Sequence, residues 1–149
     1  MPIKTYRGSL TDPEQIVIRL STNNGLTGYK IKKLQVMPVD IDGTTTHEDS
    51  VQVFTRKQGT IVDDIDFNNS ELLAAAYYLR TTTGGGTPDT ATSYETIIID
   101  NVLINQDIFL TYASGQGGQQ INYYLELEQV KLNLNEATVT TLKDMRGRE

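Results

Sequence analysis

Apolar and polar side chains alternate along much of this chain, and this period of two constrains the fold more than any other feature of the sequence. The segments EQIVIRLS, GYKIKKLQVMPV, VQVFTR and DIFLTYAS all show it. Successive side chains of a β-strand point to opposite faces of a sheet, so a strand with one buried face is apolar at every second position. Turn-forming residues separate these segments into seven or eight expected strands. The pattern predicts an all-β domain that closes as a two-sheet β-sandwich or jelly roll.

Several shorter segments carry more specific expectations. Asn24-Gly25 favours a tight turn and predicts a hairpin between the first two strands quoted above. In ELLAAAYYLR the three alanines favour a helix, whereas Tyr77-Tyr78 ahead of TTTGGGT favours a strand, which we slightly prefer. The apolar run from Ile97 to Ile99 predicts a strand covered on both faces. Residues 82–93 are rich in Gly and Thr and predict a flexible loop.

The stretch QINYYLELEQVKLNLN changes its apolar positions partway along. They are odd-numbered from Ile121 to Leu127 and even-numbered from Val130 to Leu134. Such a swap moves side chains to the other face of a sheet, so it requires a β-bulge at Glu128-Gln129 or a bend from one sheet to the other. A separate extended segment lying over the domain explains the pattern equally well.

The last segment, NEATVTTLKDMRGRE, predicts a C-terminal helix over residues 135–146. Asn135 is the expected N-cap, Glu136 suits the positive end of the helix dipole, and Arg146 suits the negative end. A narrow apolar stripe follows the helical spacing and comprises Val139, Leu142 and Met145, with Leu134 ahead of the cap. This stripe must dock either on the sandwich of its own chain or on a neighbouring subunit.

Length and composition exclude several classes of protein. The 149 residues suit one domain, 1–149, with a sizeable core. The chain has no Cys, which excludes a disulfide scaffold, a thiolate zinc site and a cysteine nucleophile. The net charge of −6 disfavours nucleic acid as a partner. No apolar run resembles a signal peptide or a membrane span, so we expect neither export by that route nor membrane insertion.

Candidate catalytic and metal-binding residues are few. His47 is the one histidine, and we expect it in a solvated loop, TTTHEDS, without the GxSxG elbow of a Ser-His-Asp triad. Carboxylates in DIDG and DDID are candidate calcium ligands, but their spacing is not that of an EF-hand, and turn residues are the simpler interpretation. Glu126 and Glu128 share a strand face with Tyr124 at a spacing of ~7 Å, yet nothing marks a sugar cleft. We predict no enzyme, cofactor or metal site.

The C-terminal half and the N-terminus together resemble a family. The runs DNVLINQDIFLTY and INYYLELEQVKLNLNEATVTTLKDMR, with KTYRGSLTD near the start, resemble small virion structural proteins of marine tailed phages. The segment from Ile41 to Ser93 departs most from that pattern. The resemblance implies a non-enzymatic β-sandwich in many copies on the virion, most plausibly a capsid decoration or stabilising subunit. It also implies homo-oligomers, contacts with the major capsid protein or other virion proteins, and assembly in the host cytoplasm.

On that interpretation the terminal segments supply the subunit contacts. The predicted contact residues are Ile3 and Tyr6 in an N-terminal arm, and Leu142 and Met145 in the C-terminal helix. A tail, baseplate or fibre component is an alternative with the same composition. A carbohydrate-binding sandwich is another, but it needs an exposed aromatic platform. Tyr123 and Tyr124 alternate faces and the chain has no Trp, so at most one of the two tyrosines could serve.

Overall fold

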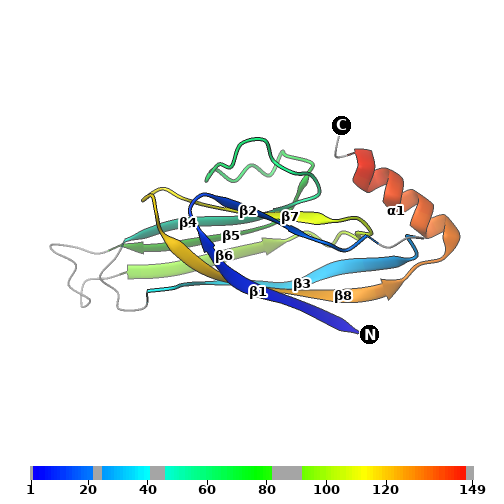
Figure 1. Ribbon diagram of the computed structural model, residues 1–149, viewed down its shortest axis with the longest axis horizontal. Helices are drawn as coiled ribbons and strands as arrows, with labels where there is room; N and C mark the ends of the chain where they lie inside the picture. The colour runs from blue at the N-terminus through cyan, green and yellow to red at the C-terminus, as the bar shows by residue number, and fades with distance from the viewer. Residues whose placement is uncertain (1, 22–24, 41–45, 82–91, 147–149) are drawn as a thin grey trace.

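In the part of the chain that the computed structural model describes, eight strands and one helix form an antiparallel two-sheet sandwich (Figure 1). The structure describes residues 2–21, 25–40, 46–81 and 92–146. One sheet has the strand order β1-β8-β3 and the other the order β2-β7-β4-β5-β6. The predicted all-β two-sheet sandwich is therefore confirmed. The elements are β1 (Ile3–Thr11), β2 (Glu14–Ile18), β3 (Thr27–Pro38), β4 (His47–Phe54), β5 (Leu72–Thr81), β6 (Thr92–Ile99), β7 (Ile108–Ser114), β8 (Gln120–Lys131) and α1 (Leu134–Arg146).

The core lies between the two sheets and consists of the alternating apolar positions that the sequence shows. Full burial of an aliphatic side chain stabilises the fold by about 1.5–3 kcal/mol, so this layer supplies most of the stability. The largest apolar side chains with almost no exposure come from both sheets and from the segment before β7, and they are Leu10, Leu34, Ile104, Ile108, Leu110, Tyr112, Ile121, Leu125 and Leu127.

The alanine-rich segment is a strand, β5, because both of its faces are covered. Ala74 and Ala76 face the core, while Ala75 packs on the other side with Phe54 and Ile65. The segment between β4 and β5 covers this outer face, and Gln52 holds it there by donating to the carbonyls of residues 62 and 64. Small side chains fit a strand enclosed between two layers, and this explains why helix propensity did not decide the structure.

The predicted hairpin is wrong, because β2 and β3 belong to different sheets. Of the predicted turn, Asn24 lies outside the described residues, and Gly25 has a φ of 67°. The chain crosses between the sheets just after Leu20, where Asp107 Oδ1 accepts hydrogen bonds from the backbone N–H groups of Leu20 at 2.8 Å and Ser21 at 2.9 Å. This long-range anchor, which no local pattern reveals, sends the chain to the other sheet.

A β-bulge is present, but in β3 and not in β8, so the predicted position at Glu128-Gln129 is wrong. The register of β8 with β3 shifts between Ile31 and Lys33, which leaves Lys32 as the extra residue. The buried positions of β3 accordingly change from odd to even after the bulge. At the other end, a Cβ on Gly28 would lie 3.0 Å from Leu103 and 3.1 Å from Leu132. Leu132 therefore covers the outer face of the three-stranded sheet beside Gly28. This cover explains why the apolar positions change from odd to even numbers at the end of β8.

Three further expectations concern the second half of the chain. β6 is an edge strand and Ile98 is 46% exposed, so the prediction of cover on both faces is wrong. The predicted loop 82–93 lies outside the described residues up to position 91, and its last two residues begin β6.

The predicted C-terminal helix is confirmed as α1, but its cap is Asn133, whose Oδ1 accepts from the Glu136 backbone N–H at 2.8 Å. No helix in the described ranges is long and apolar enough to cross a membrane.

Candidate functional site

One face of α1 docks on the sandwich through small side chains. Ala137 and Thr140 are buried there. The buried side chain of Asn105 donates from Nδ2 to the Ala137 carbonyl at 3.3 Å and to Thr141 Oγ1 at 2.6 Å. The same amide also donates to the Gly25 carbonyl at 3.1 Å. Asn105 thus ties the helix to the loop that precedes β3.

The opposite face of α1 carries the predicted apolar stripe, and it is exposed. The side chains of Leu134, Val139 and Leu142 are 74%, 66% and 57% exposed. At ~100° per residue Val139 and Leu142 lie across the helix from Ala137, whereas Leu134 is exposed at the start of the helix, on the flank between Ala137 and Leu142. We call these three residues the α1 outer face. Docking of this stripe on its own sandwich, one of the two alternatives, is therefore wrong. Met145 belongs to the last turn, where the side chains are outside the described part of the structure.

The N-terminal segment is an edge strand, β1, and not a free arm. Its register with β8 runs without a shift from Ile3 opposite Glu128 to Thr11 opposite Gln120. Ile3 is 49% exposed, whereas Tyr6 is partly buried against the core. Of these two predicted contact residues, only Ile3 therefore offers an open apolar surface. The start of β1 and the helix lie toward the same end of the molecule (Figure 1).

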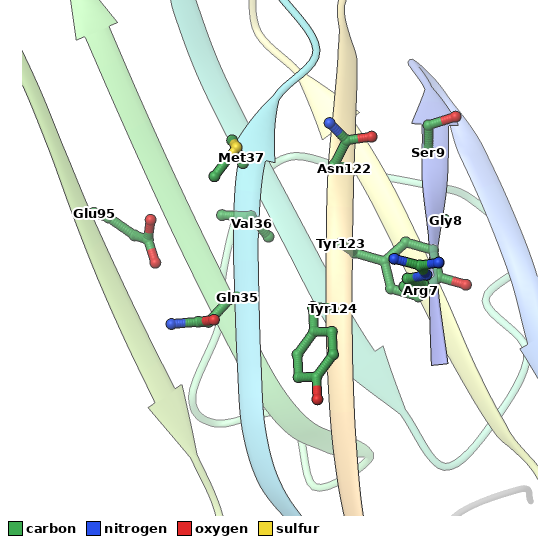
Figure 2. A pocket seen from close by; sticks show the side chains of 10 residues that line it. All are labelled: Arg7, Gly8, Ser9, Gln35, Val36, Met37, Glu95, Asn122, Tyr123 and Tyr124. Carbon is green, nitrogen blue, oxygen red and sulfur yellow. The ribbon is translucent and has the colours of Figure 1, made fainter. Parts of the chain in front are cut away.

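A groove of about 600 Å³ crosses the outer face of the three-stranded sheet (Figure 2). Two rows of outward-facing residues form its floor, because directly opposed residues of neighbouring strands share a face. One row is Arg7, Tyr124 and Gln35, and the next is Ser9, Asn122 and Met37. Glu95 reaches from β6 toward β3 at one end of the groove. Burial raises the pKa of the Glu95 carboxyl.

A chain of buried polar side chains joins the ends of β3, β4, β5 and β7. His47 has no exposed surface, so its prediction as a solvated loop residue is wrong. Its Nδ1 lies 2.8 Å from Asp49 and its Nε2 lies 2.7 Å from Asp40. Tyr112 donates to Asp49 at 2.9 Å, and Arg80 donates to Asp40 at 3.0 Å. Both ring nitrogens of His47 therefore face carboxylate oxygens.

Burial sets the electrostatics of this polar chain. It raises the pKa of Asp49, against the opposing effects of His47 and Tyr112. It also raises the pKa of Tyr112 well above its ordinary value. Asp49 is buried, and both His47 and Tyr112 are hydrogen-bonded to it. These groups are therefore placed to hold the strand ends together. We therefore assign them a structural role.

The acidic residues considered as calcium ligands do not form a site in the described ranges. No group of three or more candidate ligand side chains converges there. Asp66 accepts a hydrogen bond from the backbone N–H of Asn68 at 2.9 Å, as expected of a turn residue. Glu128 lies 3.5 Å from Lys32 in an exposed ion pair. Asp42 is outside the described residues.

Comparison with known proteins gives no match. Neither a family model, nor a curated protein, nor a solved structure is significantly similar to this chain. The functional interpretation therefore depends on the surfaces described above and on the resemblance of the sequence segments.

The sequence pattern missed two features of these surfaces. The groove needs three strands in one register, which no local pattern specifies. The cap at Asn133 was detectable, because Asn133 and Glu136 have the spacing of a capping box, and Asn133 also donates back to the Glu136 carboxylate at 3.4 Å. Placing the cap correctly puts Leu134 inside the helix and extends its apolar stripe.

Proposed function

We propose that this chain is a non-enzymatic structural subunit of a virion, most plausibly a capsid decoration or stabilising subunit of a tailed phage. The observation that carries the proposal is the α1 outer face. A helix held to the sandwich by one side leaves Val139 and Leu142 in solvent on the other, and Leu134 is exposed at its start. Such an arrangement favours a partner that covers the exposed side.

The energetics of this face suit repeated, weak contacts. Burial of a large aliphatic side chain contributes about 1.5–3 kcal/mol, and part of that gain is lost to the entropy of association. A face of three such side chains therefore supports only modest affinity for a single copy. Many copies on a symmetric lattice, each also touching its neighbours, raise the effective affinity. The net charge of −6 is compatible with a soluble subunit before assembly.

The partner that we propose is the major capsid protein or another virion protein, with a second copy of this chain as an additional contact. Ile3 supports this arrangement, because it lies toward the same end of the molecule as α1 and is 49% exposed. Its strand also has one edge without a partner strand in the sheet. A tail, baseplate or fibre position is the alternative, and the number of copies per particle distinguishes it from a head position.

The test uses particles that lack this chain and purified protein added back to them. The variant Leu134→Glu/Leu142→Glu places two charges on the α1 outer face and should reduce particle binding at least about tenfold. Phe67→Glu is the matched control, because Phe67 is 70% exposed on a different segment and should bind as the unaltered chain does. Sedimentation velocity on the same proteins measures self-association. Unchanged binding and unchanged self-association of the double variant would contradict the proposal.

A further inference from the structure

We infer that the groove on the outer face of β1, β8 and β3 binds a short segment of a neutral oligosaccharide. The inference goes beyond the virion proposal and does not depend on it. The groove is formed where residues 35–37 of β3 pair with residues 122–124 of β8. The α1 outer face lies beyond Lys131, at the other end of β8. The two surfaces can therefore be altered separately.

The polar side chains of the groove are available to a ligand. The side chains of Arg7, Gln35, Glu95 and Asn122 are exposed and make no hydrogen bond or ion pair with any part of the chain that the structure describes. These four side chains supply a guanidinium donor, a carboxylate acceptor and two amides that both donate and accept. A purely apolar ligand would remove these groups from water without replacing their hydrogen bonds, which costs free energy.

Sugar hydroxyls match this mixture because each one both donates and accepts. Tyr124 lies between Arg7 and Gln35 in the same row, and its half-buried ring offers an apolar surface for the C–H face of a pyranose (Figure 2). Met37, which is 61% exposed, adds an apolar contact in the next row. The single tyrosine platform that the sequence allowed is thus provided by Tyr124, while Tyr123 is buried.

The dimensions of the groove suit a chain of two or three sugar units. Neighbouring strands are ~4.8 Å apart and residues two apart along a strand are ~7 Å apart, so the two rows across three strands span roughly 10 Å by 7 Å. The volume of about 600 Å³ is within the usual range of ligand sites.

Charge decides between neutral and acidic glycans. A polyanion is repelled by the net charge of −6 and by Glu95 at one end of the groove. Arg7, which also lines the groove, offsets only one negative charge. A neutral glycan meets no such repulsion and can donate a hydroxyl to Glu95. The structure therefore favours a neutral hexose chain over a uronate polymer, a nucleic acid or a phosphorylated ligand.

The test is an NMR titration of the isotope-labelled full chain with maltohexaose, cellohexaose and mannohexaose, and with an oligoguluronate as the acidic probe. At least one neutral probe should shift the backbone amides of both rows with a dissociation constant of about 1 mM or lower. Tyr124→Ala should weaken that binding about tenfold or more. Tyr77→Ala, which alters a half-buried tyrosine on the other sheet, is the control and should bind normally.

Exposed positions keep the inference testable if Tyr124→Ala fails to fold. Gln35→Ala and Asn122→Ala remove exposed side chains and should each weaken binding severalfold while the chain stays folded. The inference is overturned if no neutral probe produces shifts in the groove, if binding survives all three groove variants, or if only the acidic probe binds.

Discussion

His47 shows how a single side chain can be buried at the start of a strand where its sequence neighbours suggest a loop. Its ring is enclosed between Asp49 and Asp40, and the exposed fraction of the His47 side chain is zero. Removing the partner of a buried carboxylate leaves that carboxylate without compensation, which costs several kcal/mol.

We therefore expect His47→Ala to reduce the free energy of unfolding by about 3–5 kcal/mol, because the buried Asp49 carboxylate then loses its hydrogen bond to the His47 ring. Urea unfolding followed by circular dichroism measures this change. The variant Lys57→Ala, at an exposed position, should alter stability by less than about 0.5 kcal/mol. A loss below about 1 kcal/mol for His47→Ala would show that the polar chain does not hold these strand ends.

Asp107 provides a pH-dependent contribution to stability. Burial alone would raise its pKa, but hydrogen bonds from the backbone N–H groups of Ser21 and Leu20 and from the Ser21 hydroxyl lower the pKa below its ordinary value of 3.8. The folded state therefore binds this proton less tightly than the unfolded chain does. The stabilisation is present above the ordinary pKa and is lost as the pH falls through the lowered value.

Asp107→Asn should accordingly lower the free energy of unfolding by about 1–2 kcal/mol at about pH 7, and this deficit should shrink as the pH falls below about 4. Chemical denaturation of both proteins across that range provides the measurement. A deficit that is constant with pH would mean that charge plays no part in the anchor after β2.

At the scale of the elements, α1 behaves as an appendage of the sandwich. The main core cluster contains no residue of the helix. Its attachment consists of two small buried side chains and the hydrogen bonds of Asn105. The helix is therefore held firmly enough to present a surface, but it is not required to complete the core.

A chain truncated after Leu134 should stay folded and lose about 1–3 kcal/mol of stability, because only this small interface disappears. It should also lose binding to particles. Urea unfolding and an NMR spectrum of the truncated chain test the first expectation, and the add-back assay tests the second. Failure of the truncated chain to fold would show that the helix completes the core and would remove the main support for the proposed docking face.

The elements also show which parts of the fold a single sequence can predict. Alternation located β2, β3, β7 and β8 correctly, because the core takes every second side chain from long stretches of these strands, but β1 was predicted as an arm and not as a strand. Alternation could not predict which strands pair, since the crossover after Leu20 depends on Asp107, far along the chain. Nor could it predict which side of α1 docks. The apolar stripe favoured docking through the side of the helix with Leu142, but Asn105 holds the side with Ala137 against the sandwich.

At the scale of the whole molecule, the sandwich presents two separate surfaces. The α1 outer face lies at one end, and the groove crosses the three-stranded sheet toward the other end of β8 (Figures 1 and 2). Of the residues predicted to contact other subunits, Leu142 and Ile3 are exposed, whereas Tyr6 packs on the core. The groove was not predictable, because it arises from the register of three strands that are distant in sequence.

Quantitative mass spectrometry of phage particles purified from a culture that produces this chain tests the proposed virion role most directly. It measures the number of copies of this chain relative to the major capsid protein. A decoration or stabilising subunit predicts a near-stoichiometric ratio. A ratio of a few per cent would contradict the head assignment and favour a tail or single-vertex position, and absence of the chain from the particles would contradict the virion proposal as a whole.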